Sequence, residues 1–199
     1  MSATNKPNTR GRPRRFDPDE AVARAQQLFH EKGYDGVSVA DLTQVLGINP
    51  PSFYAAFGSK AELYRKVLER YALSGALPLR QILAADQPLA VALTQLLEEA
   101  ARSYAADPQA AGCLVLEGTH CDDPQARAAA QAYHLAAQEF IRGSIAARQP
   151  QEAQRLADFV ATTMAGLSAS ARHGQSLERL LASARLAGLA LNQALPAGT

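Results

Sequence analysis

The chain lacks tryptophan and has only two cysteines, Cys113 and Cys121, among its 199 residues. Two cysteines cannot form the disulfide framework that stabilises many small secreted domains. If both lay on one helix, their spacing would separate them by about 12 Å along the axis, which is more than a disulfide bond allows. We therefore expect no intrachain disulfide and a fold that depends on a hydrophobic core.

Long hydrophobic runs are also absent. No stretch approaches the roughly 20 apolar residues that a membrane-spanning helix needs, and the polar N-terminus does not resemble a signal peptide. Hydrophobic residues make up 47% of the chain and charged residues 20%, which is ordinary for a globular protein. These features predict a cytoplasmic protein of one or two domains with no membrane partner.

The net charge of +1 hides an uneven distribution. The first 16 residues carry no acidic residue and five basic ones, namely Lys6, Arg10, Arg12, Arg14 and Arg15. Residues 1–15 show no periodicity, so we expect a disordered basic arm. A basic terminus is most often a solvated tail, but next to a DNA-reading element its arginines would contact phosphates or enter a minor groove.

Residues 38–60 predict two short helices joined by a tight turn. Ser38 and Asp41 form a start like a capping box, in which Asp takes the place of the usual Glu or Gln. Gly47 ends the first helix, because glycine adopts the left-handed conformation at little cost. Asn49 then caps the second helix.

The second of these helices is barely two turns long. Phe53 and Phe57 lie four residues apart and would anchor it on the first helix, which leaves Ser52, Tyr54 and Ala55 facing outward. A helix of this length has too little packed surface to be stable alone. A short, supported helix with polar and small residues on its free face is typical of elements that enter the major groove of DNA.

The stretch resembles the helix-turn-helix of the TetR family of bacterial repressors, whose second half usually reads G-[VI]-S-x-[GP]-[ST]-[LF]-Y-x-x-F-x-[SN]-K-x-x-L. The residues that match in register are Gly47, Ile48, Asn49, Pro51, Ser52, Phe53, Tyr54, Phe57, Ser59, Lys60 and Leu63. The resemblance covers roughly residues 16–72, because it also includes Ala25, Leu28, Phe29, Gly33, Tyr34, Ser38 and Tyr71. No stretch alternates with period two, so we expect no strands.

The resemblance implies an all-α fold of about nine helices. A three-helix helix-turn-helix domain for DNA binding would occupy residues 16–72, after the arm at 1–15. A helical ligand-binding and dimerisation domain would occupy residues 73–199. The last two helices carry many small residues and apolar stripes, and in the family these helices pair with their copies to form a homodimer.

The resemblance also implies which residues contact operator DNA. Lys60 would bind a phosphate and Thr43 the DNA backbone. Pro50 and Ala56 stand where the family often has a lysine and a histidine, so more specificity would come from thymine methyls and DNA shape than from hydrogen bonds to bases. The expected DNA-contacting residues are Arg10, Arg12, Arg14, Arg15, Ser38, Thr43, Pro50, Pro51, Ser52, Tyr54, Ala55 and Lys60.

A repressor of this family has a ligand cavity between the DNA-binding domain and the dimer interface. Its polar lining would orient an unknown small-molecule effector within an apolar pocket. The candidate lining residues are Leu97, Tyr104, Cys113, Leu116, Glu117, His120, Tyr133, His134, Phe140 and Phe159.

The sequence gives weaker support to a metal site or a thiol sensor. His120, Cys121, Asp122 and Asp123 lack zinc-site spacing, so we expect no metal and no cofactor. Thiol sensing through Cys113 or Cys121 remains an alternative, because a cysteine near a helix N-terminus has a lowered pKa, although a small buried hydrophobe is the commoner role.

The sequence shows no nucleophile–base pair and no phosphate-binding glycine loop, so we do not expect an enzyme, and an unrecognised helical active site is the remaining alternative. The interpretation that follows is a homodimeric, TetR-like transcriptional regulator. We expect a repressor that a small-molecule ligand releases from a palindromic operator.

Overall fold

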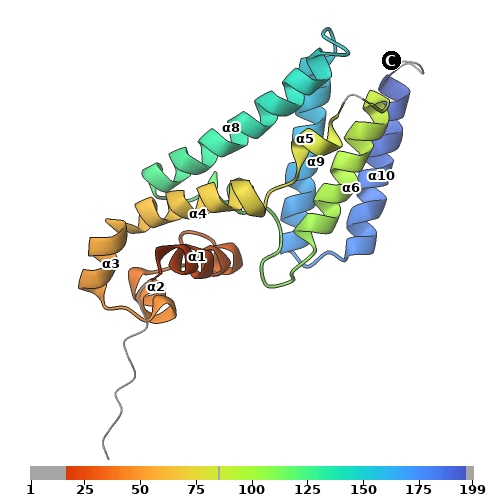
Figure 1. Ribbon diagram of the computed structural model, residues 1–199. Helices are drawn as coiled ribbons and strands as arrows, with labels where there is room; N and C mark the ends of the chain where they lie inside the picture. Colours follow the sequence, from red (N-terminus) through yellow and green to blue (C-terminus); the bar gives the residue numbers. More distant parts are fainter. Residues whose placement is uncertain (1–16, 85, 196–199) are drawn as a thin grey trace, which may run out of the picture.

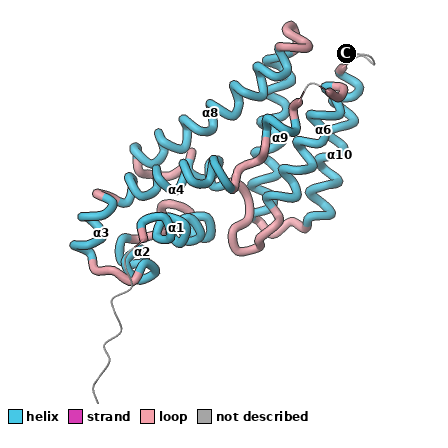
Figure 2. Tube along the Cα trace, viewed as in Figure 1, coloured by secondary structure: helices cyan, strands magenta, loops and turns pink. Residues whose placement is uncertain are grey.

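The computed structural model describes residues 17–84 and 86–195, and all regular structure within them is helical (Figure 2). The predicted basic arm lies outside the described residues. The helices are α1 (Pro18–Lys32), α2 (Val39–Leu46), α3 (Pro50–Phe57), α4 (Lys60–Ser74), α5 (Leu79–Ile82), α6 (Leu89–Tyr104), α7 (Leu114–Gly118), α8 (Pro124–Ala146), α9 (Ala153–Arg172) and α10 (Leu177–Ala194).

The predicted all-α fold is confirmed, with one helix more than expected in the described part of the chain. The additional element is α5, a single turn that follows Pro78. Within the described residues, no helix is both long enough and apolar enough to cross a membrane.

The helices form two groups at opposite ends of the molecule (Figure 1). Helices α1, α2 and α3 lie at one end, and α6, α9 and α10 run side by side at the other. α4 packs against both α1 and α8, and the 23-residue α8 reaches from the N-terminal group to α9. α8 is therefore the longest physical link between the two ends.

Two hydrophobic cores correspond to the two ends. The core of α6, α9 and α10 also takes in Ile141 and Ile145 from the second half of α8. The N-terminal core surrounds Phe29 and Tyr64 and takes in residues well beyond residue 72, namely Leu114, Cys121, Ala126 and Ala130. Because α7 and the start of α8 are packed into the N-terminal core, the boundary at residue 72 stays a prediction.

The small residues of the last two helices divide between two roles. On α10, Ala184 and Gly188 are buried, and a β-carbon at Gly188 would collide with Thr94 of α6. These residues allow close packing within the chain. Ala165 and Ala169 on α9 remain exposed. Gly166 on α9 and Ala182 on α10 are exposed as well, so the small residues expected to form a dimer interface are partly available to a partner and partly used inside the chain.

Gly118, the last residue of α7, lies where α4 and α8 converge. A β-carbon there would collide with the Tyr64 hydroxyl and lie 2.8 Å from the β-carbon of Ala130. We expect Gly118→Ala to lower the free energy of unfolding by about 1–3 kcal/mol, because neither neighbour can move without disturbing a packed core. Urea unfolding at fixed protein concentration measures the change.

Gly143 is the matched control, since it also lies in a helix but a β-carbon there meets nothing within 4 Å. Gly143→Ala should raise the free energy of unfolding by about 0.5–1 kcal/mol through helix propensity. Equal effects of the two substitutions would contradict close packing around Gly118.

Candidate DNA-binding surface and ligand cavity

The helix-turn-helix begins with a complete capping box. The Asp41 N–H donates to Ser38 Oγ at 3.1 Å, and the Ser38 N–H donates to Asp41 Oδ2 at 2.8 Å. Gly47 ends α2 in the left-handed conformation at φ 67°. Asn49 then caps α3, where its Oδ1 accepts the Ser52 N–H at 2.9 Å. The capping box, the left-handed glycine and the second cap that the sequence predicts are therefore all present in the structure. Ser38 acts as the N-cap of α2.

Thr43 is largely buried on α2. The residue is only 8% exposed, and its hydroxyl donates to the Ala40 carbonyl at 2.9 Å. Its burial follows from the helical period, because residues 39, 42, 43 and 46 follow the i, i+3, i+4, i+7 stripe of a buried face. The expected contact of Thr43 with the DNA backbone stays a prediction.

α3 is held by its two phenylalanines. Phe53 and Phe57 are buried, with ring centroids 5.6 Å apart. Tyr54 remains 52% exposed, and its ring meets the Phe53 ring edge to face. The other residues expected to face DNA are also exposed: Pro50, Pro51, Ser52 and Ala55. The chain thus presents a continuous, small-residue face around one aromatic side chain.

Lys60 begins α4 and is bound inside the protein. Its Nζ donates to the carbonyls of Tyr34 at 2.9 Å and Val37 at 2.7 Å, and lies 4.0 Å from the centroid of the Tyr34 ring. Burial lowers the pKa of Lys60, and Asp35 and Asp123 oppose that shift. The ammonium therefore fixes the loop between α1 and α2, and one of its three N–H donors is left for another acceptor.

The same loop is fastened to the start of α8. The Tyr34 hydroxyl donates to Asp123 Oδ2 at 2.7 Å, and the Asp122 N–H donates to Asp35 Oδ2 at 3.0 Å. The Tyr34 hydrogen bond is the main cause that lowers the pKa of Asp123. Asp123 also caps α8 through the N–H groups of Gln125 and Ala126. A displacement of the α8 N-terminus would therefore move the loop between α1 and α2, which leads into the helix-turn-helix.

Arg172, near the end of α9, makes a second connection. Its guanidinium donates to the carbonyls of His30 at 3.2 Å and Ala111 at 3.1 Å, and its Nε lies 3.1 Å from Glu117 Oε2. One side chain therefore joins α1, the segment before α7, and α7 itself. Sequence reasoning missed Tyr34 and Arg172 as linking residues, because their partners lie more than 50 residues away in the sequence.

A cavity of about 550 Å³, here called the apolar chamber, lies among α4, α5, α6, α7, α8 and α9. Its wall is mainly aliphatic and aromatic, with Leu77, Val115, Ile141 and Met164 among its members. The expected ligand-binding residues that line it are Tyr104, Cys113, Leu116, Tyr133, His134 and Phe140.

Three of the expected ligand-binding residues lie elsewhere. Leu97 is fully buried in the core of α6, α9 and α10, because it is on the side of α6 that faces its neighbours. Glu117 is paired with Arg172. Phe159 is on the exposed face of α9. None of the three lines the chamber.

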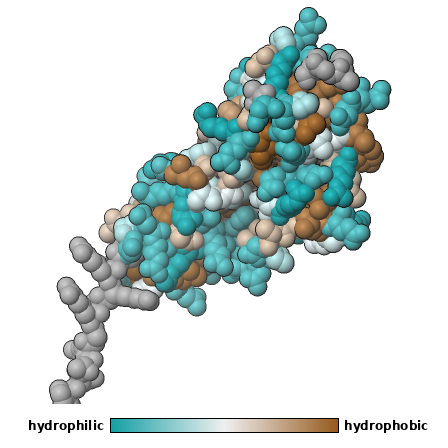
Figure 3. All heavy atoms as spheres, turned by 45° about the vertical axis from the view of Figure 1, so that its right-hand side comes forward, coloured by the Kyte–Doolittle hydropathy of each residue, from teal (hydrophilic) through white to brown (hydrophobic). Residues whose placement is uncertain are grey.

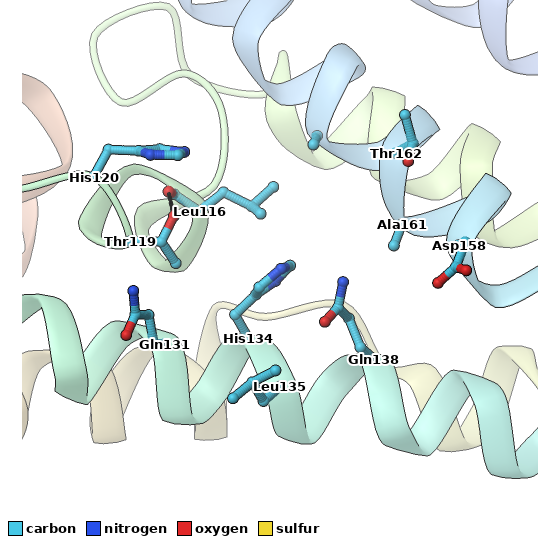
Figure 4. A pocket seen from close by; sticks show the side chains of 11 residues that line it. Leu116, Thr119, His120, Gln131, His134, Leu135, Gln138, Asp158, Ala161 and Thr162 are labelled. Atoms are coloured by element: carbon cyan, nitrogen blue, oxygen red, sulfur yellow. Dashed lines mark hydrogen bonds between the residues drawn. The ribbon is translucent and has the colours of Figure 1, made fainter. Parts of the chain in front are cut away.

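A second hollow of about 700 Å³, here called the polar antechamber, lies between α7, α8 and α9 (Figure 4). His120, the remaining expected ligand-binding residue, lines this hollow and not the chamber. Its other polar members include Gln131, Gln138, Asp158 and Thr162. Sequence reasoning did not anticipate it, since its residues come from three separate helices.

Both cysteines are free, and burial raises the pKa of each thiol. Cys113 occupies the N-cap position of α7, where the thiol-sensing alternative requires a lowered pKa. Burial outweighs the hydrogen bonds that favour the thiolate, so the pKa of Cys113 is raised, as suits the commoner role of a small buried hydrophobe. Across the described residues, no group of three histidine, cysteine or acidic side chains is arranged to hold a metal ion.

These features define a class of protein. A capped two-helix unit exposes a short recognition helix, and a separate helical end contains a ligand-sized cavity, which is the organisation of a helix-turn-helix transcriptional regulator. The profile of the family described as "Bacterial regulatory proteins, tetR family" matches residues 21–67. The chain belongs to the TetR family, and it is a DNA-binding transcriptional regulator.

Whole-length similarity supports this membership. The chain is 53% identical over 185 residues to the HTH-type transcriptional repressor BdcR of Escherichia coli (strain K12), covering 93% of this chain and 94% of that protein. It is 30% identical to the HTH-type transcriptional repressor ComR of the same strain, covering 87% and 88%. These relatives are regulators, which agrees with the expectation that the chain is not an enzyme.

The fold also matches a solved protein–DNA complex. A cysteine mutant of the TetR family transcriptional regulator CifR, in complex with 26-base-pair operator DNA, superposes with a TM-score of 0.81 at 34% identity. The match covers 90% of this chain and 99% of that chain.

The link between Tyr34 and Asp123 is testable by a double-mutant cycle. Tyr34→Phe and Asp123→Asn should each lower the free energy of unfolding. The double variant should lose about 1–2 kcal/mol less than the sum of the two single losses, because each single substitution already removes the same hydrogen bond to the carboxylate. Asn caps helices about as well as Asp, so the second substitution preserves the start of α8. Additive losses in urea unfolding would mean that the hydrogen bond does not contribute to stability.

Proposed function

We propose that the chain is a homodimeric repressor that binds a palindromic operator and leaves it when a small molecule enters the apolar chamber. The observation that carries the proposal is the exposed face of α3, supported by the buried rings of Phe53 and Phe57. Similarity to two repressors over most of the chain supports repression over activation.

In this proposal α3 enters the major groove. Tyr54 contacts the groove with its exposed ring, while Pro51 and Ala55 offer apolar contact to thymine methyls. Ser38 borders the same surface. Lys60 donates its third N–H to a phosphate, and its two carbonyl contacts fix the position of the ammonium. The arm arginines, Arg10, Arg12, Arg14 and Arg15, supply further phosphate or minor-groove contacts.

The dimer forms through α9 and α10. Apolar side chains on these helices are left at the surface: Phe159, Leu177, Leu186 and Leu189. Figure 3 shows hydrophobic residues gathered at the surface of the bundle end of the molecule. A palindromic operator requires two recognition helices about 34–36 Å apart, or a small multiple of that distance, which a two-fold symmetric dimer provides.

Ligand binding reaches the DNA-binding surface through α4 and α8. The chamber is lined by Tyr71 and Ala72 from the C-terminal end of α4, and the N-terminal end of α4 carries Lys60. A ligand that fits one position of α4 and α8 better than another shifts the population of conformers. The unfavoured conformer is the one whose recognition helices are spaced for the operator.

Selection of bound DNA from a random pool tests the function. We expect a palindromic consensus, because two identical recognition helices read the two half-sites. Tyr54→Ala should reduce affinity for the selected DNA by at least about tenfold, measured by fluorescence anisotropy, because direct contacts to base pairs are lost. The thermal stability should change little, since the Tyr54 ring is half exposed.

Leu73→Ala is the matched control, because Leu73 is an exposed apolar residue on α4 away from the recognition helix. It should leave DNA affinity unchanged. A non-palindromic consensus, or full affinity in Tyr54→Ala, would contradict the proposed recognition.

The dimer interface is tested separately. Leu186 and Leu189 on α10 are 69% and 67% exposed. Leu186→Glu combined with Leu189→Glu should convert the dimer to a monomer in light scattering, because buried unpaired carboxylates are strongly unfavourable. Leu73→Glu, at a still more exposed leucine on α4, should remain a dimer. A dimeric double variant would place the interface elsewhere.

A further inference from the structure

The apolar chamber and the polar antechamber share one wall. Leu116 of α7, His134 and Gln138 of α8, and Ala161 of α9 line both spaces. In Figure 4, the side chains of Leu116, His134 and Gln138 extend into the space between α7, α8 and α9. The partition therefore includes side chains that can change rotamer, so it can open without rearrangement of a helix.

The two spaces differ in the side chains that line them. The chamber offers mostly aliphatic and aromatic surface, with Leu77, Phe140 and Met164 among its members. The antechamber also has apolar surface, but it adds hydrogen-bonding groups, namely His120, Gln131, His134, Gln138, Asp158 and Thr162. A space with several hydrogen-bonding side chains next to a mainly apolar one fits a ligand with two chemically distinct ends.

We propose that the effector is an amphipathic molecule whose apolar tail occupies the chamber and whose uncharged, hydrogen-bonding head group lies in the antechamber. This inference rests on the proposed function, because it specifies the ligand of the same regulatory site. Hydroxyl and amide groups are the head-group chemistry that the antechamber side chains match, since its histidine, glutamine and threonine side chains can both donate and accept and the Asp158 carboxylate accepts.

The charges of the antechamber disfavour an anionic head group in that space, while Arg80 lines the adjoining chamber. Among the described residues that line it, none is lysine or arginine, and Asp158 contributes a carboxylate. Burial lowers the pKa of His134, and the neighbouring His120 lowers it further, which favours the neutral imidazole. A carboxylate or phosphate would therefore meet one like charge and no fixed positive charge.

The antechamber is also suited to admit the ligand. His120, Gln131 and Asp158 are exposed, so the hollow opens to solvent. A head group held there keeps part of its hydration, whereas the same group in the chamber would lose it. The tail can pass the partition first, and the head then remains on the solvent side.

Isothermal titration of the full-length protein with two probes of equal tail length tests the inference. Octyl glucoside carries an uncharged polyol head, and octanoate carries an anionic head. We expect octyl glucoside to bind at least about tenfold more tightly, because the antechamber has no positive partner for a carboxylate. Equal or tighter binding of octanoate would overturn the inference.

Gln131 lines the antechamber and not the chamber, so Gln131→Leu isolates the head-group site. The variant should bind octyl glucoside about fivefold more weakly, because a hydrogen-bonding partner of the head group is lost. It should bind naphthalene, a probe without a head group, as the wild type does. Gln125→Leu, at an exposed glutamine on the same helix, is the matched control and should bind both probes normally.

Unchanged affinity of Gln131→Leu for octyl glucoside, or absence of octyl glucoside binding by the wild type, would overturn the inference. Binding of the ligand-free protein to its selected operator is measured in parallel. If operator binding and its release by naphthalene persist while the head-group effects are absent, the repressor function stands and only the amphipathic ligand fails. If no operator is bound at all, the proposed function fails independently.

Discussion

The burial of Phe53 and Phe57 is the constraint on which the DNA-binding surface depends. An eight-residue helix is not stable alone in water, so α3 exists because its two rings enter the core of the N-terminal end. This anchoring fixes which residues remain outside, and Tyr54 is exposed because it lies off the face of α3 that carries Phe53 and Phe57. Core packing therefore determines which face of α3 forms the recognition surface. Contacts with α2 and α4 hold α3 in its orientation.

The core of the N-terminal end contains residues of α7 and α8 as well as residues of the first four helices. Tyr34 joins its α1–α2 loop to Asp123, and Arg172 joins α1 to α7 from the end of α9. The same helices α7, α8 and α9 enclose the chamber and the antechamber. Occupation of these spaces and placement of α3 are thus linked through continuous packing and a few long-range hydrogen bonds.

Local signals in the sequence were accurate where neighbouring residues decide the structure. The capping box at Ser38, the left-handed Gly47 and the cap at Asn49 involve partners within five residues. The burial of Thr43 was harder to predict, because it depends on which side of α2 meets α1. Leu97, Glu117 and Phe159 were assigned to the ligand cavity by helix alone, and their actual places depend on helix rotation.

The sequence by itself determined the helical fold, the family and the exposed face of the recognition helix, because helical periodicity, caps and a contiguous motif encode them locally. Tertiary structure alone decided that Lys60 clamps the α1–α2 loop, that burial raises the pKa of Cys113, and that His120 faces the antechamber. Each of these depends on groups that are distant in the chain and meet only after the helices have packed. The contacts of Lys60, the raised pKa of Cys113 and the position of His120 therefore cannot be predicted from any single segment of the chain.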